Sequence, residues 1–150
     1  RPHGRRHGGL MDEAAAPFSA TGRCLCGDVS WGIAGPLPPV GFCHCSQCRR
    51  VSGAGSNAVL NVRAERLAWV SGENARRSYA LPSGWSTTFC ERCGCPTPQM
   101  GPHGRWFVPA GSLDGDPDLA ISAHIRLVDK PGWAVIGDDA PRFSEGPPQR

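Results

Sequence analysis

The sequence predicts a mainly β domain with little helix, and two observations support this fold class. The 150 residues include 20 Gly and 15 Pro, which exceeds the usual globular share and favours short elements joined by turns. Apolar and polar residues alternate with a period of two in several short stretches, which is the pattern of strands with one buried face. A chain of this length has enough residues for one core, so we expect one domain.

The alternating stretches place the expected strands in chain order. The first strand lies within 27–33, and a turn rich in Gly and Pro follows at 35–39. The same alternation returns at 58–62, at 106–108 and at 121–127. We therefore expect a sheet of short strands.

One short helical segment is expected directly after Cys45. Ser46 is a residue type that caps helix N-termini, and the run 47–51 can form about one turn. Gly53 can end that turn because glycine readily adopts the left-handed conformation of a helix C-terminus.

Charge and hydropathy argue against two classes of function. The formal net charge of +3 is small and the basic residues are scattered, whereas nucleic-acid-binding proteins gather them on one face. No apolar run approaches the roughly 20 residues of a membrane span, and the first ten residues lack the apolar stretch of a signal peptide. We expect a cytoplasmic protein that binds neither nucleic acid nor membranes.

Eight Cys fall into three tight groups, which are the strongest signal in the sequence. The groups are C-L-C at 24–26, C-H-C-S-Q-C at 43–48 and C-E-R-C-G-C at 90–95. In a reducing compartment such groups indicate metal ligation or redox chemistry rather than disulfides. Zinc binds thiolates in a tetrahedron, and short spacings bring two sulfurs close together. We predict zinc ligation, with iron–sulfur ligation as the alternative.

Spacing alone does not divide these ligands between sites. Eight thiolates can make two closed four-Cys sites without chemistry. The middle group offers three Cys within six residues, and three protein ligands with one open position are the catalytic arrangement for zinc. This favours two zinc ions per chain, one structural and one catalytic.

Five motifs in a fixed order resemble one known family. They are G-R-C-L-C-G-D-V-S-W at 22–31, C-H-C-S-Q-C-R-R-V-S-G at 43–53, F-C-E-R-C-G at 89–94, A-G-S-L-D at 110–114 and H-I-R-L-V-D-K-P-G-W at 124–133. They are similar to the glutathione-dependent formaldehyde-activating enzymes, a family that includes the centromere protein V proteins. The resemblance covers 21–143 and implies an Mss4-like fold of mostly antiparallel β structure. We expect 1–20 and 144–150 to be tails, the first of them disordered.

The resemblance also implies how the ligands are divided. The Cys that match a closed structural site are Cys24, Cys26, Cys90 and Cys93. Those that match a three-Cys catalytic site are Cys43, Cys45 and Cys48.

The implied activity is that of a carbon–sulfur lyase. Glutathione or a related thiol would add to formaldehyde or another small aldehyde, with zinc lowering the pKa of the thiol or holding the carbonyl oxygen. The main alternative is a non-catalytic zinc module that binds a protein partner, as Mss4-like folds can. A third possibility is a thiol redox protein that uses Cys93 and Cys95.

Residues near the motifs carry further predictions. Arg49 and Arg50 are candidates for binding glutathione carboxylates through their planar guanidinium groups. His124 is either a general base or a surface residue. Cys95 is expected to be an unligated thiol rather than a fourth ligand, and His44 to point away from the metal. The aromatic residues expected in the core are Trp85, Trp106, Phe107 and Trp133.

Overall fold

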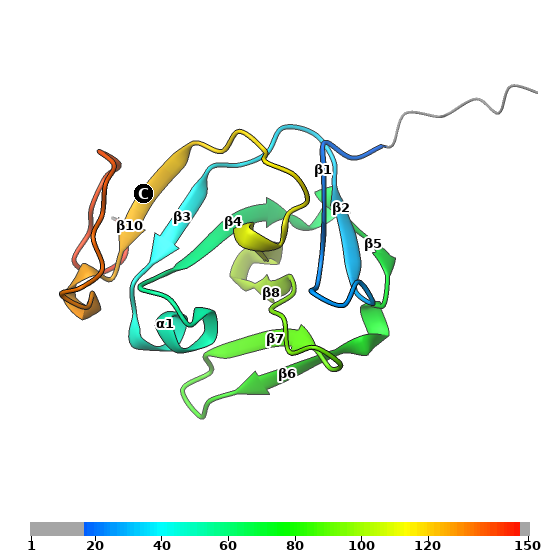
Figure 1. The fold of residues 1–150 in the computed structure, drawn as a ribbon, viewed down its shortest axis with the longest axis horizontal. Coiled ribbons are helices and arrows are strands. Elements are labelled where there is room, and N and C mark those ends of the chain that lie inside the picture. The colour runs from blue at the N-terminus through cyan, green and yellow to red at the C-terminus, as the bar shows by residue number, and fades with distance from the viewer. Residues whose placement is uncertain (1–16, 148–150) are drawn as a thin grey trace, which may run out of the picture.

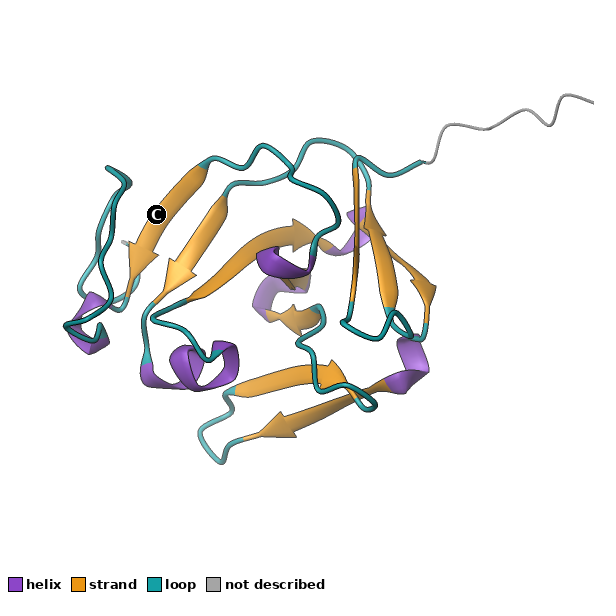
Figure 2. Cartoon of the chain, in the orientation of Figure 1, coloured by secondary structure: helices purple, strands orange, loops and turns teal. Residues whose placement is uncertain are grey.

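The computed structural model describes residues 17–147 and has the mainly β fold that the sequence predicts (Figure 2). The strands are β1 (Ala20–Arg23), β2 (Ser30–Ile33), β3 (Val40–Cys43), β4 (Asn57–Arg63), β5 (Leu67–Ser71), β6 (Arg76–Ala80), β7 (Ser86–Cys90), β8 (Gln99–Gly101), β9 (Arg105–Pro109) and β10 (Ile121–Ile125). The α-helix of the described residues is α1 (Ser46–Ser52). Single 3-10 turns lie at Ala64–Arg66, Glu73–Ala75, Pro102–Gly104, Ala110–Ser112 and Leu127–Asp129.

The strands form three sheets. One sheet has the order β1-β2-β5, the largest has the order β10-β3-β4-β9-β8, and β6 pairs with β7 in a hairpin. Every named pair is antiparallel except β10 with β3. In Figure 1, α1 lies between the ends of β3 and β4 and the β6–β7 hairpin. Parts of the large sheet, the helix and the hairpin therefore face a common region.

The apolar core joins the small sheet to the large one. Trp31 of β2 and Leu60 and Val62 of β4 are fully buried. Complete burial of such a side chain stabilises a fold by about 1.5–3 kcal/mol relative to exposure. Cys24 and Cys90 belong to the same buried cluster, so the first predicted metal site lies at the edge of the core.

Four predicted strands are confirmed. The second half of the stretch 27–33 forms β2, and the other three alternating stretches lie on β4, β9 and β10. The last of these stretches leaves the sheet earlier than expected, because Arg126 adopts a left-handed conformation with a φ of 59° and begins a 3-10 turn. The residues Leu127 onward are therefore not part of the strand.

The predicted helix is present, and its first turn is capped by a thiol. The N-cap residue is Cys45, whose Sγ accepts a hydrogen bond from the backbone N–H of Cys48, so Ser46 is the first helical residue rather than the cap. Gly53 ends the helix with a φ of 66°, as the sequence predicts. No helix of the described residues is long and apolar enough to cross a membrane.

Parts of both predicted tails take part in backbone pairing. The N–H of Ser19 donates to the carbonyl of Ile33, and Ala20 is the first residue of β1. At the other end, the N–H of Arg126 donates to the carbonyl of Glu145. The rest of the two predicted tails, 1–16 and 148–150, lies outside the described residues.

Candidate metal and thiol site

The first thiol cluster joins two distant segments of the chain. Sulfurs of Cys24, Cys26, Cys90 and Cys93 all lie within 4.8 Å of one another. The Sγ atoms of Cys26 and Cys90, 64 residues apart, are separated by 3.7 Å. Cys24 and Cys90 are buried, and the other two lie closer to the surface. Four mutually close sulfurs fit a closed tetrahedral zinc site.

Two glycines shape the turns that carry these thiols. Gly27 follows the C-L-C pair with a φ of 84°, and Gly94 follows the C-E-R-C group with a φ of 71°. Other residues adopt such angles at a cost, so glycine suits both turns. The N–H of Val29 donates to the Sγ of Cys24 at 3.3 Å, which fixes that sulfur within its turn.

The second cluster lies on one short segment. Cys43 ends β3, Cys45 caps α1, and Cys48 lies in the first turn of the helix. Their sulfurs lie within 4.8 Å of one another. Three thiols at the junction of a strand and a helix N-terminus fit a metal ion that keeps one open position.

Hydrogen bonding divides the protons unevenly within each cluster. A hydrogen bond from the Cys48 thiol leads the interactions that lower the pKa of Cys43 to about 6, and the Cys45 backbone N–H and Arg126 act in the same direction against the effect of burial. The pKa of Cys48 is raised, because this thiol donates to Cys43 and is buried. In the first cluster the N–H of Cys95 leads the interactions that lower the pKa of Cys93 to about 6. Each cluster thus contains a thiol that ionises readily, which favours cation binding.

Cys26 shows the opposite behaviour. The N–H of Asp28 lowers the pKa of Cys26, but burial and hydrogen bonds with three neighbouring thiols outweigh it and raise the pKa to about 12. Thiols this close together cannot all ionise unless a cation compensates their charge.

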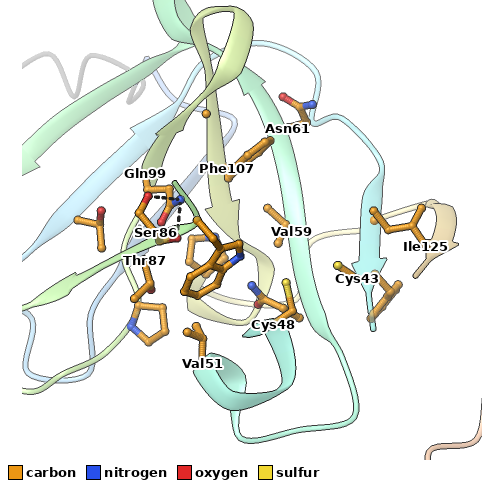
Figure 3. A pocket seen from close by; sticks show the side chains of 18 of the residues that line it. Cys43, Cys48, Val51, Val59, Asn61, Ser86, Thr87, Gln99, Phe107 and Ile125 are labelled. Atoms are coloured by element: carbon orange, nitrogen blue, oxygen red, sulfur yellow. Dashed lines mark hydrogen bonds between the residues drawn. The ribbon is translucent and has the colours of Figure 1, made fainter. Parts of the chain in front are cut away.

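A cavity of about 710 Å³ lies beside the second cluster. Its lining includes Cys43 and Cys48, and it extends from α1 to the hairpin and across β3, β4, β8, β9 and β10. Figure 3 shows the sulfurs of Cys43 and Cys48 on one side, with Ser86 and Thr87 on the other. None of the four Cys of the first cluster lines this cavity. The two clusters therefore differ in surroundings, one lying at the core edge and the other beside a space for a small molecule.

Arg49 and Arg50 lie on α1 outside the lining of the cavity. Arg50 is exposed, and Arg49 is partly buried with a buried Nε that has no hydrogen-bond partner among the described residues. Both lie in the last turn of α1, where positive charge is favourable.

His44 and His124 form a buried pair behind the second cluster. His44 Nε2 lies 3.0 Å from His124 Nδ1, and His124 Nε2 lies 3.0 Å from an Asp138 carboxylate oxygen. His44 and His124 are only 3% and 4% exposed, so the interpretation of His124 as a surface residue is wrong. Burial leads the effects that lower the pKa of His44. His44 thus points to His124, as alternation along an extended segment predicts. Asp138 was not predicted, because no sequence motif links it to His124.

Cys95 and the predicted core aromatics lie in varied surroundings. Cys95 belongs to neither thiol cluster, and its Sγ lies 3.9 Å from the Ser112 hydroxyl. Trp106 packs against the core, as predicted. Phe107 and Trp85 line the cavity. The core prediction for Trp133 is wrong, because 69% of this residue is exposed.

Comparison with known proteins places this arrangement in a family. The family model for the glutathione-dependent formaldehyde-activating enzyme matches residues 19–129. The chain belongs to this family. The matched region contains all eight Cys and both His of the buried pair, while Asp138 lies beyond it.

A relative and a solved structure support the family and the fold, respectively. A Halomonas elongata protein named for the same family is 32% identical over 124 residues, which cover 77% of this chain and 79% of the relative. A crystal structure of a Rhodobacter sphaeroides protein has a TM-score of 0.54 and 21% identity, and the match covers 68% of this chain and 99% of the other. At that identity the structural match speaks for the fold alone.

Proposed function

We propose that the chain is a zinc-dependent enzyme of the carbon–sulfur lyase type that joins a thiol, such as glutathione, to formaldehyde or another small aldehyde. Membership in a family named for glutathione-dependent formaldehyde activation supports the choice of reaction. The observation that carries the proposal is that the three-thiol cluster of Cys43, Cys45 and Cys48 has two members in the wall of a cavity of about 710 Å³. The cluster at the core edge lines no such space.

The reaction requires a thiolate held near a carbonyl carbon. The sulfur–carbon bond forms as the carbonyl π bond breaks, the electron pair moves to oxygen, and that oxygen takes the proton that the thiol gave up. Zinc, when bound by Cys43, Cys45 and Cys48, would stabilise the thiolate and polarise the carbonyl.

The residues of this chain position the reactants. The N–H of Cys48 donates to Cys45 Sγ at 3.4 Å, which holds that sulfur at the start of α1 beside the other two thiols of the cluster. The cavity walls hold the thiol and the aldehyde near each other, which lowers the entropy cost of their meeting. Arg49 and Arg50 remain candidate contacts for a carboxylate that lies outside the cavity.

The first cluster is proposed as a structural zinc site. Cys24, Cys26, Cys90 and Cys93 provide four sulfurs and leave no position for a substrate in a tetrahedral site. All eight Cys are free thiols in this structure. This agrees with a reducing location such as the cytoplasm, which is part of the proposal.

The test is the exchange rate between free formaldehyde and its thiol adduct, followed by magnetization-transfer NMR. Metal-replete protein should raise this rate above the buffer rate, and Cys45→Ser should abolish the increase. Cys95→Ser is the matched control because Cys95 lies in neither cluster, and it should retain the increase. A rate equal to the buffer rate with every thiol tried would refute the enzyme and favour a non-catalytic zinc module.

A further inference from the structure

A smaller pocket adjoins the cavity beside the second cluster. It has a volume of about 330 Å³, and Met100 and Trp106 are the apolar members of its lining. The other lining residues are Glu73, Arg76, Ser78, Ser86, Thr88 and Gln99. We call this space the polar pocket, because it brings together a cation, an anion, three hydroxyl groups and an amide.

The polar pocket and the cavity share one wall. The residues that line both spaces are Ser86, Thr88, Gln99 and Met100. In Figure 3, Ser86 and Gln99 lie across the cavity from Cys48, and dashed lines mark the hydrogen bonds from the Gln99 amide to Ser86. A ligand whose thiol lies near the second cluster can therefore extend across the cavity toward the polar pocket.

The guanidinium group of Arg76 is held in one orientation in this pocket. Its Nε donates to the carbonyl of Glu73 at 3.2 Å, and its Nη1 donates to the carbonyl of Pro98 at 2.9 Å. The group also lies 4.0 Å from the centre of the Trp69 ring. Its Nη2 is 3.9 Å from a carboxylate oxygen of Glu73, which exceeds hydrogen-bond distance. Nη2 can therefore donate to a ligand carboxylate while the other contacts stay intact, and the fixed group loses little entropy on binding.

Arg76 and Glu73 differ in their exposure to water. The side chain of Arg76 is 16% exposed and that of Glu73 is 56% exposed. Burial lowers the pKa of Arg76, and the Glu73 carboxylate acts in the opposite direction. A cation with so little hydration gains from an anion at hydrogen-bond distance. The Glu73 carboxylate, beside it, can accept from an ammonium group, so the pocket offers partners for two opposite charges.

We infer that the polar pocket binds the α-amino-acid head group of the thiol substrate, with its carboxylate at Arg76 and its ammonium group at Glu73. Such a head group carries both charges on one carbon atom, as the γ-glutamyl end of glutathione does. A carboxylate without the ammonium group would meet the repulsive charge of Glu73, so the pocket selects the zwitterion. This inference rests on the proposed function, because it names the part of the thiol that the same site recognises.

Titration calorimetry with three matched thiols tests the inference. The probes are glutathione, its analogue without the ammonium group (glutarylcysteinylglycine) and its analogue without the γ-glutamyl carboxylate (4-aminobutyrylcysteinylglycine). All three keep the thiol and the glycyl carboxylate, so contacts of these groups cancel in the comparison. On metal-replete protein, glutathione should bind at least about tenfold more tightly than either analogue, because each analogue lacks one charged hydrogen bond. Equal binding of the three thiols would overturn the inference.

Two variants locate the head group within the protein. Glu73→Gln should abolish the preference for glutathione over the analogue without the ammonium group, and Arg76→Gln should abolish the preference over the analogue without the carboxylate. The matched controls are Glu91→Gln and Arg77→Gln, because these two residues form an ion pair beside the same hairpin and line neither space. Both controls should keep both preferences.

The Glu73 variant keeps the test decisive if Arg76→Gln does not fold. The guanidinium of Arg76 packs on Trp69, so its loss can disturb the fold, whereas the exposed carboxylate of Glu73 can be replaced with little structural effect. A preference for the ammonium group that persists in Glu73→Gln would refute the assignment of the head group to this pocket.

The binding assay separates this inference from the proposed function. A protein that prefers glutathione over both analogues but accelerates no adduct formation would refute the proposed reaction and retain the head-group site. A protein that accelerates adduct formation but binds the three thiols equally would retain the reaction and refute the inference.

Discussion

Loss of a ligand from the first thiol cluster should destabilise the fold more than loss of one from the second. A zinc ion that joins Cys26 to Cys90 closes a loop of 64 residues, whereas one held between Cys43 and Cys48 closes only about 5 residues. Loop-closure entropy scales as 3/2 RT ln n, so the first ion contributes about 2 kcal/mol more to stability. For a chain of this size that difference corresponds to about 4–8 °C in the melting temperature.

Thermal melts with metal analysis on two variants measure this difference. Cys90→Ser should melt at least that much lower than Cys45→Ser or be insoluble, and Cys45→Ser should fold with about one zinc ion per chain. Cys90 is fully buried, so a hydroxyl there disturbs the core by itself. Cys93→Ser removes a less buried ligand and controls for this effect. If Cys45→Ser melts as low as both variants of the first cluster, the second site is structural and the catalytic interpretation loses its main support.

Three further predictions follow from the same groups. Protein purified without chelator should contain about two zinc ions per chain by elemental analysis, and one ion or none would contradict the two-site assignment. Replacing both Arg49 and Arg50 with Ala should weaken glutathione binding by about 1.5–3 kcal/mol per lost charged hydrogen bond and leave the binding of a small neutral thiol unchanged, as measured by titration calorimetry. Equal effects on the binding of both thiols would place these residues on the solvated surface. A hydrogen bond from the Ala140 N–H is the main cause that lowers the pKa of Asp138 below 3.8, and a hydrogen bond from His124 adds to it. The Asp138 carboxylate therefore stabilises the fold above pH 3.8, and this stabilisation is lost as the pH falls through the lower pKa of the folded state. Asp138→Asn should therefore lower the melting temperature at pH 7 but much less near pH 3, and a constant difference across this range would contradict the assigned interaction.

Sequence patterns predicted the parts of the fold that have one buried and one exposed face. The stretch 58–62 has this alternation, and β4 there buries Leu60 and Val62. The hairpin strand β6 was not predicted, because four of its five residues are exposed and its sequence, R-R-S-Y-A, has no apolar alternation. β8 is only three residues long and offers too few positions for a period to be detected. Burial on one face therefore decides whether a strand can be recognised from sequence.

The thiol clusters were predictable for a different reason. Ligands within a few residues of one another are close in any fold, so the spacing of Cys43, Cys45 and Cys48 specified a local cluster before the structure was known. The family resemblance supplied the pairing of the segments at 24–26 and 90–93, and their sulfurs do lie together. The cavity was not predictable, because its walls come from one helix, six strands and the turns beside them, whose arrangement is set by long-range packing.

The buried His44–His124 pair explains how the second cluster is held toward the cavity. Along the extended segment, Cys43 and Cys45 point to one side and His44 to the other. The His44 N–H donates to the carbonyl of Ile125, and its ring meets His124, which also stacks on Phe42 with 5.0 Å between ring centres. Backbone and side chain of one residue are thus both fixed to β10. Since His44 cannot rotate without breaking these contacts, it limits the directions in which Cys43 and Cys45, on either side of it, can present their sulfurs, so the two thiols stay beside Cys48.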